Sequence, residues 1–202
     1  MERENDRGVS SLPGERYYAD VPSRAFALLA DMFLLSIAIF IAAIVVSVLI
    51  GPAVEFNSTA DSAGEAVTLD RGVAIVDAVI SLVISAAYFA GSWVVLAASP
   101  GQRLMGMRLG AEADGRALTR GQALLRWALL GAPFGVAAVL ATALSGPADA
   151  IVKVATLAWY ALLLITTARS PTKQGLHDRV PGTVVAKRAT PVDWGRPDSD
   201  AG

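Results

Sequence analysis

The sequence contains no cysteine and one histidine, His177, and each shortage excludes a kind of chemistry. Without cysteine the chain forms no disulfide, thiolate nucleophile or cysteine-ligated metal site. One histidine cannot build a multi-histidine metal site, so we expect no metal and no other cofactor. No serine lies in the signature of a hydrolase's strained turn, and we expect that the protein is not an enzyme. No basic cluster with interleaved aromatic residues occurs, which argues against nucleic-acid binding.

Charged residues are also scarce, at 17% of the chain against about 25% in soluble domains. Hydrophobic residues make up 54% of the chain, and they form four long runs at about 24–50, 72–98, 123–144 and 151–168. As a helix, Phe26 to Ile50 would extend about 37 Å, enough to cross a hydrocarbon core of ~30 Å. We therefore predict an all-α integral membrane protein with four transmembrane helices arranged as two hairpins.

Outside these runs the sequence is polar. We expect residues 1–22 and 189–202 to be disordered cytoplasmic tails on either side of a membrane domain at 23–188. Met107–Ala111 and Thr183–Lys187 have the β-branched and apolar content of short strands, and we predict that they pair in a small cytoplasmic cap of strands and loops.

Basic residues indicate the orientation, because Lys and Arg are enriched in short cytoplasmic loops. The two segments that we expect inside contain Arg103, Arg108, Arg116, Arg120 and Arg126, and then Arg169, Lys173, Arg179, Lys187, Arg188 and Arg196. The opposite loops offer only Arg71, with Lys153 just inside the fourth helix. We therefore expect a bacterial cytoplasmic membrane protein with both termini cytoplasmic and the acidic loop 51–70 outside.

The two halves of the sequence resemble each other. FALLADMF at 26–33 and WALLGAPF at 127–134 each follow an arginine, and each pair of apolar runs ends in Ser-Pro. Arg103-x-x-Gly106 and Arg179-x-x-Gly182 then precede short apolar segments. A parallel repeat about an axis along the membrane normal would explain these matches. The alternative is that apolar helices match by chance.

Asp31 is the anomaly of the first run, since a charge at the centre of a membrane helix costs about 2.5–3.5 kcal/mol. Arg24 lies on roughly the same helix face but about 10 Å away along the axis, too far for direct contact. We expect Asp31 to pair with an arginine from elsewhere, Arg126 first, with Arg103 and Arg179 as alternates. Such a pair would lock the first helix to the cytoplasmic loops. The alternative is a carboxylate that carries protons or cations, with its pKa set by Arg24.

Three further features have two interpretations each. His177-Asp178-Arg179 could be a proton relay, since histidine titrates near neutral pH, or Asp178 could be structural, as a cap or as a partner for a loop arginine. Asp77 and Lys153 pair across the bundle or extend outward to the membrane surface. The segment GAPFG at 131–135 serves packing within the chain or dimerisation, and its proline should kink the third helix and free carbonyls that neighbours must satisfy.

Several of these residues resemble the pattern of the RDD family of bacterial membrane proteins, named for one arginine and two aspartates. Arg24 and Asp31 match at the start of the first helix, and Asp178 matches in Leu-His-Asp-Arg. The similarity also includes GQRLMGMRL at 101–109, the Asp114-Gly115 pair, Arg126 and Gly182-Thr-Val-Val. It covers about residues 23 to 188 and implies the membrane fold. For the family, transport has been suggested, including cation/proton antiport.

Together these features predict a non-enzymatic membrane scaffold or accessory protein. Its expected partners are the lipid bilayer, anionic lipid headgroups, and another membrane protein or a second copy of the chain. The alternative is a small transporter that uses Asp31, for which four spans with few polar groups make a poor path.

Overall fold

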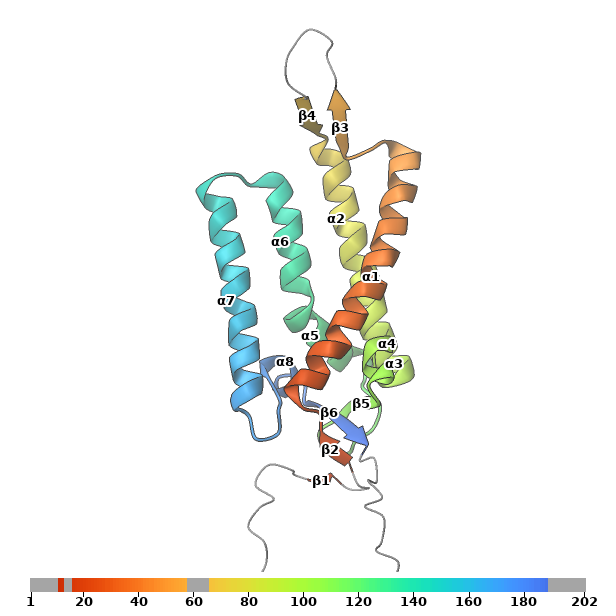
Figure 1. Cartoon of the computed structure of the whole chain (residues 1–202), viewed down its shortest axis with the longest axis vertical. Helices are drawn as coiled ribbons and strands as arrows, with labels where there is room; N and C mark the ends of the chain where they lie inside the picture. The colour runs from red at the N-terminus through yellow and green to blue at the C-terminus, as the bar shows by residue number, and fades with distance from the viewer. Residues whose placement is uncertain (1–10, 13–15, 58–65, 189–202) are drawn as a thin grey trace, which may run out of the picture.

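The structure is a computed structural model that describes residues 11–12, 16–57 and 66–188, and this part of the chain is mostly helical (Figure 1). The long helices are α1 (Val21–Ile50), α2 (Arg71–Ala86), α6 (Ala132–Ala143) and α7 (Pro147–Arg169). Helix α2 packs against α1 and α6, and α6 packs against α7, so the four form one bundle. Short helices and a sheet cover one end of the bundle, and a hairpin of β3 (Val54–Asn57) and β4 (Ala66–Leu69) extends from the other.

Three helical stretches are long and apolar enough to cross a membrane by length and composition: Val21–Ile50, Arg71–Leu96 and Pro147–Arg169. Helix α5 (Arg120–Leu130) and α6 add a fourth if this pair, bent by 52°, counts as one span. These stretches coincide with the four predicted apolar runs to within a few residues. The protein is therefore a helical, membrane-type protein, as predicted.

The second stretch is continuous but irregular. Helix α2 passes into a π-helical turn, η1 (Ala87–Gly91), and then into α3 (Ser92–Leu96). The Ser92 hydroxyl donates to the carbonyl of Tyr88, which lies in the wide turn. Such turns reorient side chains within a helix, and here η1 carries Tyr88 and Phe89 toward α1 and the core.

The predicted kink in the third run is confirmed. Pro133 lies in the first turn of α6 and has no N–H to donate, so the backbone breaks between α5 and α6. Two side chains of α7 donate hydrogen bonds to the carbonyls freed by the bend. Trp159 Nε1 donates to Leu129 O at 2.8 Å, and the Tyr160 hydroxyl donates to Leu130 O at 2.8 Å. The bend therefore also anchors α7.

The other intramembrane features favour packing within the chain. Gly135 faces α2, where an added Cβ would lie 2.3 Å from Leu82 Cδ1, so this glycine permits close packing of α2 and α6. Lys153 pairs with Asp149 one turn earlier at 2.7 Å, and its side chain is 65% exposed. Of the two interpretations of Lys153, the structure favours outward extension, since Lys153 pairs with Asp149 within α7.

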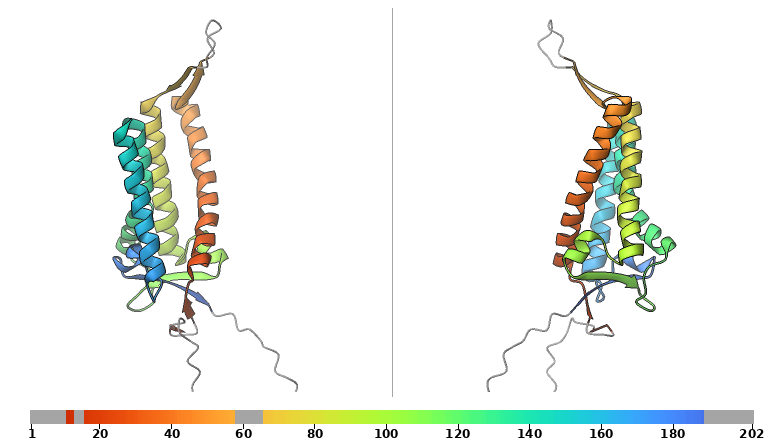
Figure 2. Two further views of the ribbon diagram at one scale, coloured as in Figure 1. Left: turned by 60° about the vertical axis from the view of Figure 1, so that its left-hand side comes forward. Right: turned by 90° about the vertical axis from the view of Figure 1, so that its right-hand side faces the viewer.

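The cap is an antiparallel four-stranded sheet in the order β1-β2-β6-β5. Its strands are β1 (Ser11–Leu12), β2 (Arg16–Tyr18), β5 (Met107–Ala111) and β6 (Thr183–Arg188). Helix α4 (Pro100–Leu104) precedes β5, and α8 (Leu176–Arg179) precedes β6. The predicted pairing of 107–111 with 183–187 is confirmed. Because β2 pairs with β6, segments from both ends of the chain meet at this end of the bundle (Figure 2).

The register of β5 and β6 supports an internal repeat. Leu109 lies opposite Val185, its counterpart in the repeat, while Met107 lies opposite Lys187 and Ala111 opposite Thr183. A two-fold axis through the central pair relates the two strands with this register. Both strands follow a glycine with positive φ, 68° at Gly106 and 63° at Gly182, a conformation that side chains disfavour. Chance similarity of apolar helices would not produce this arrangement.

The predicted amino-terminal tail is shorter than expected. Arg16–Tyr18 forms β2, and α1 begins at Val21, where the Asp20 side chain accepts a hydrogen bond from the Ser23 amide at 3.0 Å. Residues 16–22 therefore belong to the folded part. The rest of the predicted tails, residues 1–10, 13–15 and 189–202, lies outside the described residues.

The core lies where the cap meets the bundle. Its buried apolar side chains come from α1, η1, α3, β5, α5 and β6, and include Leu35, Trp93, Leu109 and Val185. On the outward faces of the helices the large apolar side chains are exposed, such as Phe33 at 67% and Val48 at 79%. That distribution suits helices whose outer faces contact lipid.

Close contact between α1 and α4 depends on Gly101, and this gives a first prediction. An alanine Cβ there would lie 2.1 Å from Ala27 O and 2.8 Å from Asp31 Cγ. We expect Gly101→Ala to lower the free energy of unfolding by roughly 1–3 kcal/mol, because backbone must move. Gly121→Ala is the control, since nothing lies within 4 Å of its Cβ position. The measurement is thermal unfolding in detergent. If Gly101→Ala is as stable as the control variant, the close packing of α4 against α1 is contradicted.

Candidate functional site

The Asp178 side chain is fully buried and lies between two arginines. Arg24 Nη1 donates to Oδ2 at 2.8 Å, Arg126 Nε donates to Oδ1 at 2.9 Å, and Arg126 Nη2 forms an ion pair with Oδ1 at 2.7 Å. The exposed fractions of these side chains are 0% for Asp178, 3% for Arg126 and 13% for Arg24. Burial opposes ionisation, but Arg126 and Arg24 lower the pKa of Asp178 below its usual value. The cluster thus has two positive charges and one negative charge.

Each member of this cluster comes from a different helix. Arg24 lies in the first turn of α1, and its other nitrogens donate to Ala19 O at 3.0 Å and Val185 O at 3.5 Å. Arg126 lies on α5, which begins with a capping box formed by Thr119 and Gln122. Asp178 belongs to α8. The cluster therefore fastens the starts of both halves to the cap.

Asp31 has different partners from those predicted. Its side chain is 2% exposed. Oδ1 accepts from the Tyr88 hydroxyl at 2.9 Å and the Gly101 amide at 2.7 Å, and Oδ2 accepts from the Ser99 hydroxyl. The prediction that Asp31 pairs with Arg126 is wrong, because the guanidinium of Arg126 binds Asp178. Neutral donors from η1 and α4 satisfy the carboxylate instead.

His177 lies beside the cluster in α8. Its Nε2 is 3.5 Å from Asp178 Oδ2, and its Nδ1 is buried without a hydrogen-bond partner among the described residues. Burial lowers the pKa of His177 to about 4, even though Asp178 favours its protonation and Arg126 and Arg24 oppose it. The imidazole is therefore neutral near pH 7 and adds no charge to the cluster.

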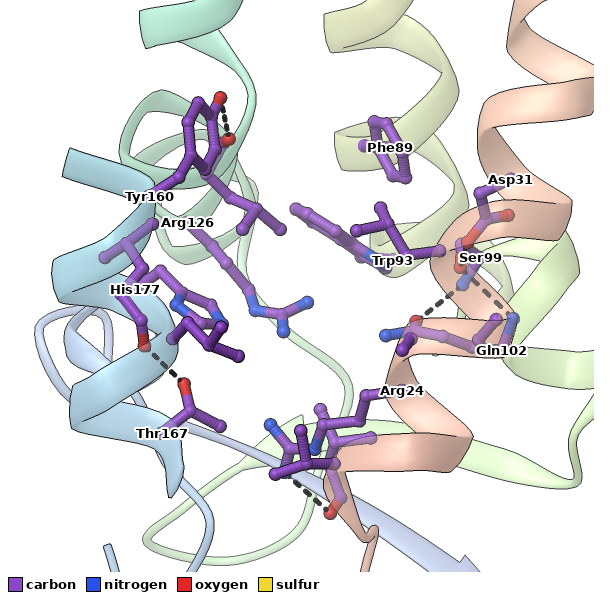
Figure 3. Close-up of a pocket in the computed structure, with 18 residues that line it drawn as sticks. Arg24, Asp31, Phe89, Trp93, Ser99, Gln102, Arg126, Tyr160, Thr167 and His177 are labelled. Carbon is purple, nitrogen blue, oxygen red and sulfur yellow. Dashed lines mark hydrogen bonds between the residues drawn. The ribbon is translucent and has the colours of Figure 1, made fainter. Parts of the chain in front are cut away.

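A cavity of about 250 Å³ lies between α1, α3, α5, α7 and α8 (Figure 3). Arg126 enters it from α5, Trp93 from α3 and His177 from α8, while Leu28, Asp31 and Leu163 are among the other lining residues. The guanidinium carbon of Arg126 is 4.5 Å from the centre of the Trp93 ring, in a cation–π contact. Arg126 Nη1 and Trp93 Nε1 are both buried without a partner in the described part of the chain.

The comparison with protein families was made over the whole chain. The model of the RDD family matches residues 18–182. This chain belongs to the RDD family. A comparison with curated proteins finds no match.

In this RDD protein the three residues that give the resemblance have separate roles. Arg24 and Asp178 bind each other, whereas Asp31 lies along α1 from Arg24 and fixes α4. Arg103 and Arg179 are exposed on the cap, and Gly106 and Gly182 form its turns. Among the described residues, no group of three or more His, Asp or Glu side chains could hold a metal.

Some residues of the site were not anticipated from the sequence. Ser99 and Gln102 form a capping box at α4, a signal that was present in the Ser-Pro-Gly-Gln motif. Tyr88 and Trp93 lie in an apolar run, and nothing in the local sequence distinguishes them from residues that face lipid. Their roles follow only from the packing of η1 and α3 against α1 and α5.

The shared carboxylate leads to a prediction about coupling. Asp178→Asn leaves two buried guanidiniums without their counter-ion and should lower the free energy of unfolding by about 3–5 kcal/mol. Arg126→Gln with Asp178→Asn should cost less than the sum of the single changes, because both changes remove the same Arg126–Asp178 ion pair, although Arg24 still loses its counter-ion. Arg126→Gln with Asp31→Asn should be close to additive. Chemical unfolding of the single and double variants in detergent measures these coupling energies. Coupling of Arg126 with Asp31 rather than with Asp178 would refute Asp178 as the partner of Arg126.

The buried imidazole makes stability depend on pH. Between pH 6.5 and about 4 the unfolded chain binds a proton on His177 that the folded protein does not. Stability should therefore fall by about 3 kcal/mol as pH falls through this window, and His177→Gln should remove most of that loss. The depressed pKa of Asp178 affects stability only below this window. The measurement is the unfolding midpoint of the native protein and of His177→Gln at pH 7 and at pH 4. An equal loss of stability in the two proteins would contradict the role of His177.

Proposed function

We propose that this RDD protein is a non-enzymatic scaffold or accessory protein of the bacterial cytoplasmic membrane that binds anionic lipid at its cytoplasmic end. In this proposal four spans form two hairpins, α1 with α2–α3 and α5–α6 with α7, and both termini are cytoplasmic. The distribution of Arg and Lys over the loops supports this orientation.

The observation that carries the proposal is a pair of equivalent loops on the cap. Each Arg-x-x-Gly motif presents an exposed arginine, Arg103 or Arg179, followed by an exposed apolar side chain. Leu104 is 74% exposed and Val180 is 58% exposed. An arginine beside an exposed apolar group suits the headgroup region, where the charge binds phosphate and the apolar side chain enters the acyl boundary.

Other exposed arginines lie on the same end of the molecule. Arg108 is in β5, Arg116 follows it with a side chain that is 85% exposed, and Arg120 begins α5. Each basic residue near an anionic membrane surface contributes roughly 1 kcal/mol. The cap therefore combines charge with apolar anchors, which favours lipid over a purely polar partner.

Transport through Asp31 remains the alternative, and the contacts of Asp31 do not favour it. Both carboxylate oxygens already accept hydrogen bonds from Tyr88, Ser99 and Gly101. A proton or cation carrier would have to break these contacts in each cycle, and with them the junction of α1 and α4.

Orientation can be tested in this cysteine-free chain by single cysteines at Ser145, in the turn between α6 and α7, and at Ala113, after β5. Both positions are exposed. A membrane-impermeant maleimide added to intact cells should label Ser145→Cys and should label Ala113→Cys only after lysis. Labelling of Ala113→Cys in intact cells would overturn the proposed topology.

Lipid binding can be tested on the purified protein in mixed micelles. Phosphatidylglycerol should raise the free energy of unfolding more than phosphatidylcholine does. Arg103→Gln with Arg179→Gln should remove about 2 kcal/mol of this difference. Arg71→Gln, at the other end of the bundle, is the matched control and should change nothing. Equal stabilisation by both lipids would defeat the proposed function.

A further inference from the structure

The cavity beside Arg126 contains hydrogen-bond donors without acceptors. Arg126 Nη1 and Trp93 Nε1 are buried and unpartnered within the described residues, although other nitrogens of Arg126 bind Asp178. A buried donor without an acceptor costs about 1–3 kcal/mol, and more when the donor is charged. A ligand with acceptor oxygens would remove this cost.

The charge beside the cavity favours an anion. Arg24 and Arg126 share the single carboxylate of Asp178, and His177 is neutral near pH 7 because burial disfavours its charged form. One positive charge of the cluster is therefore uncompensated. Asp31 also lines the cavity, but its oxygens are occupied by donors from η1 and α4 and it forms no ion pair among the described residues.

The size and lining of the cavity favour a lipid headgroup. Its volume of about 250 Å³ is below the roughly 300–1,000 Å³ of sites for drug-sized ligands, so a headgroup fits better than a whole lipid. Apolar side chains from α1 and α7, including Leu28, Leu163 and Leu164, form much of the wall. Leu28 is 43% exposed and Leu164 is 58% exposed, so the apolar wall continues onto the outer surface of the bundle.

We propose that an anionic phospholipid of the cytoplasmic leaflet places its phosphate in this cavity, where the phosphate accepts hydrogen bonds from Arg126 Nη1 and Trp93 Nε1. Its acyl chains leave along the apolar side chains of α1 and α7. The proposal rests on the proposed orientation and lipid preference, but it names a separate site, since Arg103 and Arg179 lie outside this cavity.

Three variants test the site without removing the exposed arginines. Leu163→Phe fills part of the cavity and leaves the ionic cluster intact. Trp93→Phe keeps an aromatic ring against Arg126. It removes the Nε1 donor and makes the ring system smaller. Arg126→Lys keeps the charge and removes Nη1. Arg71→Gln, an exposed arginine at the other end of the bundle, is the matched control, and the double variant Arg103→Gln with Arg179→Gln measures the contribution of the exposed cap arginines separately.

The measurement is native mass spectrometry of the delipidated full chain, titrated with phosphatidylglycerol, with phosphatidylcholine, or with inorganic phosphate. We expect one phosphatidylglycerol per chain to bind more tightly than phosphatidylcholine or inorganic phosphate does. Leu163→Phe and Arg126→Lys should weaken this binding about tenfold or more, and Trp93→Phe several-fold, because a charge-assisted hydrogen bond contributes more than a neutral one. The control variant should keep the tight site.

Each other outcome overturns a particular part of the proposal. Unchanged single-lipid binding in Trp93→Phe and Leu163→Phe would exclude the cavity and leave lipid binding by the exposed arginines. Equal binding of inorganic phosphate would assign the site to a free anion. Equal binding of phosphatidylcholine would overturn both this site and the proposed function. Loss of the tight site in the double variant Arg103→Gln with Arg179→Gln would place that site on the surface of the cap.

Discussion

The carboxylate of Asp178 is the interaction on which the cap and its junction with the bundle depend. A fully buried carboxylate needs hydrogen-bond donors or counter-charges around it. Here the donors are Arg24 at the start of α1 and Arg126 on α5, the helices that begin the two halves. Because Asp178 lies on α8, directly before β6, one carboxylate joins both halves to the cap sheet.

Asp31 solves a similar problem with neutral groups. It lies in the same half as its partners, and it ties α1 to η1 and α4 through Tyr88, Ser99 and Gly101. Helix α4 thus packs on α1 as α8 packs on α5, and β5 and β6 meet about the two-fold axis between them. The repeat is therefore structural as well as sequential, but the two aspartates differ in role. Asp31 acts within one half, whereas Asp178 acts between the halves.

Much of the fold was predictable because its signals are local. Apolar runs predicted the helices, Pro133 predicted the bend, and the Arg-x-x-Gly motifs predicted the paired strands. The partner of Asp31 was not predictable, because it depends on how close α4 approaches α1. That approach requires the absence of a side chain at Gly101, which sequence alone does not connect with Asp31. The cavity is harder still, since Trp93 in an apolar run resembles any other lipid-facing residue.

The most direct test of this account is hydrogen exchange, measured by mass spectrometry, on the native protein and on Asp178→Asn in the same detergent. If the shared carboxylate joins the halves, the variant should lose protection together in the first turns of α1, along α5 and in β5 and β6. The outer ends of α2 and α7 should keep theirs. Unchanged protection at α1 and α5 would contradict the central place given to Asp178.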